Sequence, residues 1–225
     1  MSPSPDDVSS AVDDAFRAFV GDPRFPCLGG ASVVRRRTYR LRVYGALGTL
    51  GSAAALALDL APFARERPVR EGAPRAFVAV FTGRAPGSER AFERRLWTQL
   101  QQLHERDEPG AGWDPAVSPD PDDPRFSFSF AGRAFFVVGL HPRSSRLARR
   151  FRWPALVFNP HAQFERLRAE GRYARFRALI RERDVALQGT LNPNLTDFGE
   201  RSEARQYSGR ATEPEWRCPF HPRES

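Results

Sequence analysis

Three short apolar runs limit the fold of this chain more than any other feature of its sequence. They are RAFVAVF at 75–81, FFVVGL at 135–140 and ALVFN at 155–159, and they are rich in aromatic and β-branched residues. Runs of this length are typical of buried strands and are much shorter than the roughly 20 apolar residues of a membrane helix. The sequence therefore predicts a buried β-sheet and no membrane-spanning segment.

Helical and strand-like segments surround these runs. TYRLRVYG at 38–45 alternates with the period of a half-buried strand, and residues 48–66 between it and 75–81 predict a helix that Pro62 shortens or bends. This gives one unit of strand, helix and strand. Residues 88–107 predict an amphipathic helix with Ser88 as its N-cap. The Pro-, Gly- and Asp-rich segment 108–124 then predicts a long loop, either mobile or a functional lid.

The second half of the chain contains a predicted hairpin and a second crossover. Residues 126–130 and 133–141 are separated by Ala131-Gly132, which has the length of a tight hairpin turn. A short helix over 144–151 would connect the strand 135–141 to the strand 155–159 as a parallel crossover. A helical region over 160–187, interrupted near Gly171, would follow with Asn159 as its cap and Pro160 in its first position.

Length and composition favour one cytoplasmic domain. At 225 residues the chain suits a single domain, which we place at 21–225. The preceding segment, 1–20, is acidic and Ser-rich, and we expect it to be partly disordered. It does not have the pattern of a secretory signal. The fold class is α/β, with α+β as the alternative: a mixed β-sheet with flanking helices, one β-hairpin and a βαβ crossover. A homodimer is compatible with this reading.

Charge and cysteine content exclude other classes of protein. The net charge is +8, but all 35 basic residues are Arg and they are scattered among Asp and Glu, so we do not expect a nucleic-acid-binding surface. The two cysteines, Cys27 and Cys218, are far apart in sequence and are predicted to be free thiols that do not form a zinc module.

Two histidines follow the ends of predicted strands. His141 ends the strand 135–141, and His161 comes shortly after the strand 155–159. A parallel crossover would bring both to the sheet edge where ligands bind, as general bases, metal ligands or haem ligands. The alternative for each is a structural histidine. Ser144, Ser145 and Arg146 at a predicted helix start offer hydroxyl, N–H and guanidinium donors to an anion, although simple N-capping by Ser144 explains the pattern as well.

Several segments together resemble the YqcI/YcgG family. They are FPC at 25–27, GLHPRSSRLARRF at 139–151, LVFNPHAQFERLR at 156–168, LQGTLNPNL at 187–195, SEARQYSGR at 202–210 and WRCPF at 216–220. The resemblance covers about residues 20 to 222. It implies a haem-dependent N-oxygenase, which uses haem b, dioxygen and electrons from an external reductase or other donor to hydroxylate a guanidine or amine nitrogen of an amino acid or derivative. The alternative function is a non-enzymatic haem carrier or sensor.

The resemblance also assigns roles to residues. His161, with a slight preference, or His141 would ligate the iron, and the other would be a second ligand or a distal acid or base; Cys27 is a less favoured thiolate ligand, since a small buried residue is the commoner role. Ser144, Ser145 and Arg146 would hold a haem propionate or a substrate carboxylate. Arg205, Tyr207 and Arg210 would supply further polar contacts, and Phe side chains the apolar walls.

Overall fold

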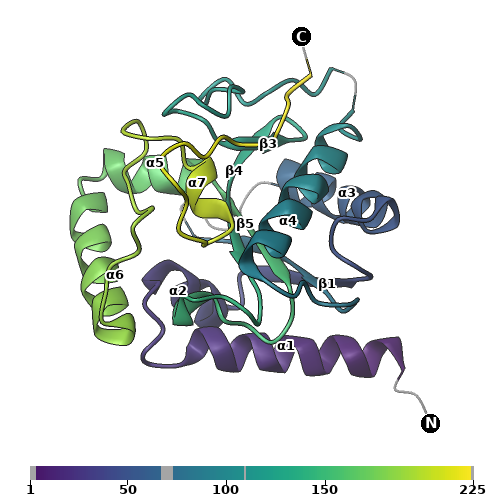
Figure 1. Cartoon of the computed structure of the whole chain (residues 1–225), viewed down its shortest axis with the longest axis horizontal. Helices are drawn as coiled ribbons and strands as arrows, with labels where there is room; N and C mark the ends of the chain where they lie inside the picture. Colours follow the sequence, from purple (N-terminus) through teal and green to yellow (C-terminus); the bar gives the residue numbers. More distant parts are fainter. Residues whose placement is uncertain (1–3, 67–72, 109, 224–225) are drawn as a thin grey trace.

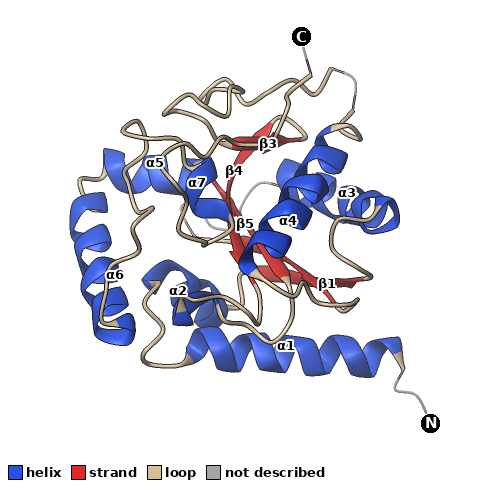
Figure 2. Ribbon diagram, in the orientation of Figure 1, coloured by secondary structure: helices blue, strands red, loops and turns tan. Residues whose placement is uncertain are grey.

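A computed structural model describes residues 4–66, 73–108 and 110–223, which form a five-stranded sheet flanked by helices (Figures 1 and 2). The strand order is β1-β2-β5-β4-β3. The strands are β1 (Tyr39–Tyr44), β2 (Ala76–Phe81), β3 (Phe128–Phe130), β4 (Arg133–Leu140) and β5 (Ala155–Pro160). β1 and β2 are parallel and every other neighbouring pair is antiparallel. The sheet is therefore mixed, as the sequence predicts.

One of the two predicted crossovers is confirmed and the other is wrong. β1, α3 (Leu50–Arg65) and β2 form a parallel strand-helix-strand unit. β4 and β5 are antiparallel, with Leu140 opposite Ala155. A parallel return requires a crossover, usually a helix, that carries the chain back along the sheet. In the connection 141–154 only the 3₁₀ turn η1 (Leu147–Arg149) is helical, so the chain reverses its direction at the same edge.

Helices cover both faces of the sheet. α1 (Pro5–Gly21) and α2 (Leu28–Arg36) pack on one face, where Val12, Phe16 and Val20 of α1 are buried. We expected a partly disordered segment over 1–20; burial of these three side chains explains why residues from Pro5 onward are helical instead. α3 and α4 (Glu89–His104) pack on the other face.

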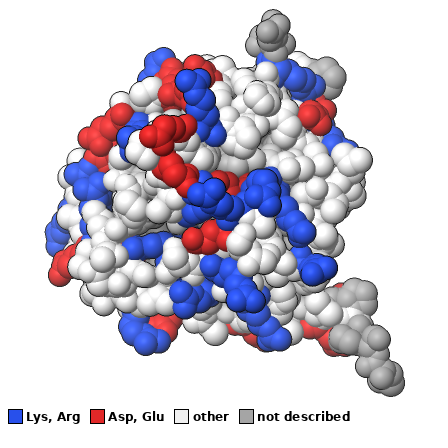
Figure 3. All heavy atoms as spheres, in the orientation of Figure 1, with Lys and Arg blue, Asp and Glu red and all other residues white. Residues whose placement is uncertain are grey.

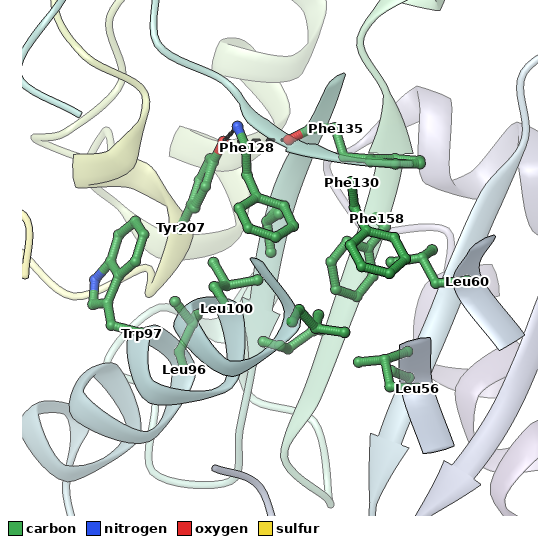
Figure 4. Packing of buried hydrophobic residues seen from close by; sticks show 14 of the residues in the cluster. Leu56, Leu60, Leu96, Trp97, Leu100, Phe128, Phe130, Phe135, Phe158 and Tyr207 are labelled. Carbon is green, nitrogen blue, oxygen red and sulfur yellow. Dashed lines mark hydrogen bonds between the residues drawn. The ribbon is translucent and has the colours of Figure 1, made fainter. Parts of the chain in front are cut away.

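The larger core cluster lies between α3, α4, the sheet and the C-terminal part of the chain (Figure 4). Phe128, Phe135 and Phe158 face Leu residues of α3 and α4 there, and Tyr207 inserts from α7 (Ala204–Tyr207). The Tyr207 hydroxyl accepts a hydrogen bond from Phe128 N at 3.0 Å and lies 3.2 Å from Phe135 O. α7 thereby lies beside β4, and the C-terminal segment is part of the core.

The predicted hairpin is confirmed, and the long loop is tied to it. Ala131 and Gly132 both have positive φ, 51° and 71°, as a two-residue turn with the twist of the flanking strands requires. Trp113 packs against the core. Asp114 accepts a hydrogen bond from Ala134 N at 2.9 Å. These contacts hold Trp113 and Asp114 of the segment against the core and β4.

Two helices follow β5, and their apolar side chains are only partly buried. α5 (Ala162–Ala169) and α6 (Tyr173–Gln188) are separated at Gly171, whose φ is 67°, as predicted. The predicted cap is wrong, because Pro160 still pairs in β5 and the Asn159 amide donates to Phe136 O and Val157 O. Neither helix contains a buried apolar residue. Among the described residues no helix has the length and apolar character needed to cross a membrane.

Candidate functional site

The structure separates His141 from His161. His161 N donates to Ala134 O at 2.8 Å, so its backbone lies beside the start of β4, whereas His141 directly follows the end of that strand. Ala134 and His141 are seven residues apart, which corresponds to about 23 Å at roughly 3.3 Å per strand residue. The prediction that the two imidazoles converge is therefore wrong. They lie at opposite ends of β4 because β4 and β5 are antiparallel.

His141 is enclosed by core side chains. It is 0% exposed, and its ring stacks on Phe92 of α4 with 4.2 Å between centroids. Nδ1 accepts from Arg143 N at 3.3 Å, and Nε2 is buried without a partner among the described residues. Burial lowers the pKa of His141 to about 4, against the opposing influence of Glu89. The ring is therefore neutral and fills space between α4 and the end of β4.

His161 is also buried, but a charged side chain lies beside its ring. Its Nε2 is 3.0 Å from Oε1 of Glu165, one helical turn later, and its Nδ1 is buried without a partner among the described residues. The ring of Phe198 lies 4.6 Å from it, centroid to centroid. Burial lowers the pKa of His161 despite Glu165. A neutral imidazole with Nε2–H held by a carboxylate leaves the Nδ1 lone pair free for a ligand.

Protein carboxylates occupy the donors predicted for an anion. Ser145 donates from both N and Oγ to Oε1 of Glu89, each at 2.8 Å. Arg146 donates to Oδ2 of Asp184 at 2.5 Å, in an ion pair with both side chains about nine-tenths buried. Ser144 Oγ accepts from Arg146 N at 3.2 Å. These residues join the β4-β5 connection to α4 and α6, at the end of β4 opposite to His161.

Two of the three candidates from ARQYSGR fasten the C-terminal segment. Arg205 donates to the carbonyl oxygens of Glu213, Pro214 and Trp216. Arg210 forms ion pairs with Glu93, which is buried, and with Glu213. Tyr207 is the exception, because its hydroxyl lies 2.6 Å from Oε1 of Glu203.

Cys27 has a structural role at the start of α2. It is half-buried, and its Sγ caps that helix by accepting from Gly30 N at 3.4 Å. Burial raises the pKa of the thiol, although the N–H groups of Gly30 and Gly29 act in the opposite direction. A raised pKa disfavours the thiolate that haem ligation would require.

The sequence reasoning missed a polar cluster beside His161. We call it the Arg168–Glu203 cluster: Ser127, Glu165, Arg168, Glu203 and Tyr207. Of these five residues, Tyr207 alone was a candidate from the sequence. Arg168 donates to Glu165, so one carboxylate contacts both Arg168 and His161. Glu203 Oε1 accepts hydrogen bonds from Ser127 Oγ at 2.7 Å and from Tyr207 Oη at 2.6 Å. Glu165 and Arg168 lie four and seven residues after His161, and this helical spacing could have predicted that they share a helix face with it. Ser127 and Glu203 are far from His161 in sequence, so no local pattern predicts their position.

Unpartnered polar atoms gather in the same part of the chain. Of the ten buried side-chain nitrogen and oxygen atoms without a partner among the described residues, five belong to residues 161–197. The apolar side chains of α5 and α6 are only half-buried or exposed, Leu179 at 39% and Val185 at 42%. Buried polar atoms in folded proteins normally have partners. These atoms do not form one site, because Arg183 contacts Pro23 and Phe25 and lies next to Asp184, the partner of Arg146.

The residues fit haem iron at His161 and not at the pair of histidines. One imidazole with a free nitrogen, a carboxylate on its other nitrogen and a neighbouring aromatic ring is a suitable proximal ligand. Two axial ligands from His141 and His161 on one iron are excluded by their separation. No group of three or more His, Cys, Asp or Glu side chains among the described residues is arranged to hold a bare metal ion.

Surface charge does not single out another site. On the face shown in Figure 3, Arg side chains lie among Asp and Glu side chains. Among the described residues, exposed ion pairs join Arg90 to Glu213 and Arg166 to Glu170. Two shallow hollows lie over α1 and β1, lined by residues such as Ser9 and Arg42, and neither includes a histidine or the Arg168–Glu203 cluster.

Comparison with known proteins gives a family but no described activity. The model of the YqcI/YcgG family matches residues 16–221. The chain is similar to a protein named "Uncharacterized protein YcgG" from Bacillus subtilis (strain 168), with 29% identity over 136 residues. That match covers 58% of this chain and 53% of the relative, so the chain spans about half the length of the curated relative it matches. No solved structure matches the chain.

Proposed function

This chain belongs to the YqcI/YcgG family, and from that membership we propose that it is a haem-dependent N-oxygenase with His161 as the iron ligand. Its substrate would be a guanidine or amine nitrogen of an amino acid or derivative. The family resemblance supports the type of reaction. The single observation that carries the choice of ligand is the buried, unpartnered Nδ1 of His161, whose Nε2 is held by Glu165.

The residues around His161 have defined tasks in this proposal. Glu165 accepts a hydrogen bond from Nε2–H of His161. This hydrogen bond fixes the tautomer of the imidazole and leaves Nδ1 as the atom that binds the ligand. Arg168 donates to Glu165 and holds that carboxylate in place. Phe198 covers the imidazole and restricts water. When bound, haem supplies dioxygen activation and oxygen-atom transfer to nitrogen, with electrons from an external donor.

The separation of the histidines also bears on the alternative function. A haem carrier or sensor that fills both axial positions with His141 and His161 does not fit one haem in this structure. If His161 were the one protein ligand to the iron, a haem bound there would remain open to dioxygen or another small ligand. Carbon monoxide should therefore bind the reduced haem protein and shift its Soret band.

Hemin titration of the full chain tests the ligand. We expect wild type to bind hemin with a sharp Soret band, His161→Ala to lose that band, and His141→Ala to retain it. His141 is the matched control because it is also a buried histidine with one unpartnered nitrogen. Far-UV circular dichroism would verify folding of both variants.

Two outcomes would contradict the proposal. If wild-type protein leaves the absorption spectrum of free hemin unchanged, the proposed function is excluded. A His141→Ala variant that loses the band while His161→Ala keeps it would move the ligand to the opposite end of β4. Mass analysis for an added oxygen atom after incubation with arginine, lysine and simple guanidines, with dioxygen and a reductant, tests the chemistry.

A further inference from the structure

The side of α3 that points away from the core is apolar along its whole length. On the inner side, Leu56 and Leu60 are 0% exposed and belong to the larger core cluster (Figure 4). On the outer side, Leu50 and Leu58 are 62% and 79% exposed. We call the exposed residues of this helix from Leu50 to Pro62 the α3 face: Leu50, Gly51, Ala54, Ala55, Leu58 and Pro62. None of them carries a polar side chain.

The exposed side of α4 shows how a solvated helix of this protein differs. α4 has 16 residues, as α3 does, and its exposed residues are Arg90, Arg94 and Thr98. A helix at a protein surface normally directs polar side chains to water in this way, whereas a helix that is apolar on every side is normally buried. α3 has the second kind of composition, but it packs against α4, β1 and β2 on its inner side alone. This composition indicates that a partner covers the outer side.

The α3 face is electrically neutral, which restricts the chemistry of that partner. The charged side chains of α3 are Asp59 and Arg65. Asp59 accepts a hydrogen bond from Tyr44 Oη at 2.8 Å, and Arg65, beyond the face, pairs with Glu108 at 2.6 Å. Helices that bind lipid surfaces carry Lys or Arg beside their apolar side, and nucleic acids require such charges as well. The complementary surface is therefore neutral and apolar, as the α3 face itself is.

The α3 face is also self-complementary in shape. Leu50, Ala54 and Leu58 lie four residues apart and form one ridge that is symmetric about Ala54. Gly51 and Ala55 form the next ridge, whose small side chains leave a shallow groove beside the first. When two such helices cross antiparallel at Ala54, at about 50°, the ridge of each lies in the groove of the other and Leu50 of one copy contacts Leu58 of the other. Every contact then occurs twice, as a twofold interface between identical chains requires.

We propose that the α3 face is the contact surface of a homodimer, in which two copies of this chain pack α3 against α3 about a twofold axis at Ala54. A standard protein interface buries about 800 Å² on each partner. The outer side of a 16-residue helix, about 24 Å long and about 10 Å wide, offers less than this area. The dimer is therefore weak, with a dissociation constant on the order of 10–100 µM. It depends neither on haem binding nor on N-oxygenation.

Analytical ultracentrifugation of the full chain from about 1 to about 300 µM tests the dimer. The mass of wild type should change from 25.4 kDa toward twice that value as the concentration rises. Ala54→Glu should weaken the dimer at least about tenfold, because two like charges meet at the axis. Ala18→Glu, at an exposed alanine of α1, is the matched control and should dimerise as wild type does.

A charge-swapped pair of variants tests the twofold axis itself. Ala54→Arg alone should weaken the dimer as Ala54→Glu does, whereas an equimolar mixture of the two variants should dimerise again, because opposite charges then face each other. Residue 54 is exposed in a single copy. Far-UV circular dichroism and thermal unfolding at about 1 µM, where the monomer predominates, should therefore be nearly the same for wild type and both variants.

Every other outcome overturns the inference. A wild-type protein that stays at 25.4 kDa over the whole concentration range has no such dimer. Equal dimerisation of Ala54→Glu and Ala18→Glu would place the interface elsewhere, and a mixture of Ala54 variants that stays monomeric would exclude a twofold axis at this residue. Co-sedimentation of wild type with phosphatidylcholine or phosphatidylserine vesicles, abolished in Ala54→Glu, would assign the face to a membrane surface. Hemin titration is a separate measurement, so the failure of one proposal is distinguishable from the failure of the other.

Discussion

Burial changes the protonation of single side chains in this protein, and each change follows from the neighbours of the group. His141, in contact with Phe92, has its pKa lowered to about 4 by burial, and Glu203 has its pKa raised to about 8 by the same cause. Each group loses its charged form because water no longer solvates it. A position in a strand or helix does not reveal these shifts, because they depend on side chains far away in the sequence.

Glu203 should make stability depend on pH. Its folded-state pKa of about 8 exceeds its ordinary value of 4.5, so between these values the folded protein holds a proton that the unfolded chain has lost. This contribution is fully present below pH 4.5 and is lost as the pH rises through 8, at up to about 1.4 kcal/mol per pH unit. Denaturant unfolding of wild type and Glu203→Gln across pH 5–8 measures it. Parallel stability profiles for the two proteins would show that Glu203 is ionised when folded.

At the scale of elements, local patterns identified most helices and strands, but long-range contacts decided how they pair. Turn chemistry predicted the β3-β4 hairpin, and periodicity predicted α3 and α4. The direction of β5 relative to β4 was predicted wrongly, because the segment between them forms only a 3₁₀ turn and no crossover helix. Arg146 and Asp184, which form an ion pair, are 38 residues apart, so no local sequence pattern predicts their contact.

Gly139 allows α4 and α7 to approach β4 closely. A Cβ atom at this position would lie 2.7 Å from Phe92 Cε1 and 2.7 Å from Tyr207 O. We expect Gly139→Ala to destabilise the protein by about 3 kcal/mol, because part of the obstruction is backbone. Gly51→Ala in α3 is the control: its Cβ meets nothing within 4 Å, and helix propensity should stabilise it by about 0.5 kcal/mol. Equal unfolding midpoints for the two variants would contradict this packing.

At the scale of the whole molecule, the C-terminal segment completes the core. Phe220 is 1% exposed and contacts the rings of Trp97, Trp113 and Phe128. Arg205 and Arg210 hold the segment before it through carbonyl groups and ion pairs. Arg205 and Arg210, which the family resemblance suggested as site residues, therefore anchor the C-terminal segment. Polar side chains that hold a chain segment cannot be distinguished by sequence from those that bind a ligand.

Loss of the Phe220 ring should affect the entire domain. Phe220→Ala should lower the free energy of unfolding by about 3–5 kcal/mol, since a buried aromatic side chain is replaced by a cavity. Leu58→Ala, at a side chain that is 79% exposed, should change it by less than about 0.5 kcal/mol. Thermal and urea unfolding of both variants measures the difference. A Phe220→Ala protein as stable as wild type would show that the tail is not part of the core.

The sequence by itself determined the strands, most helices, the hairpin turn and the likeness to the YqcI/YcgG family, because periodicity, turn residues and short motifs are local properties. It also identified His161 as a candidate ligand. Only the tertiary structure decided that His141 lies at the other end of β4, that Arg146, Arg205 and Arg210 bind protein groups, and that Ser127 and Tyr207 bind Glu203. Those results depend on contacts between residues far apart in the chain, which no local pattern specifies.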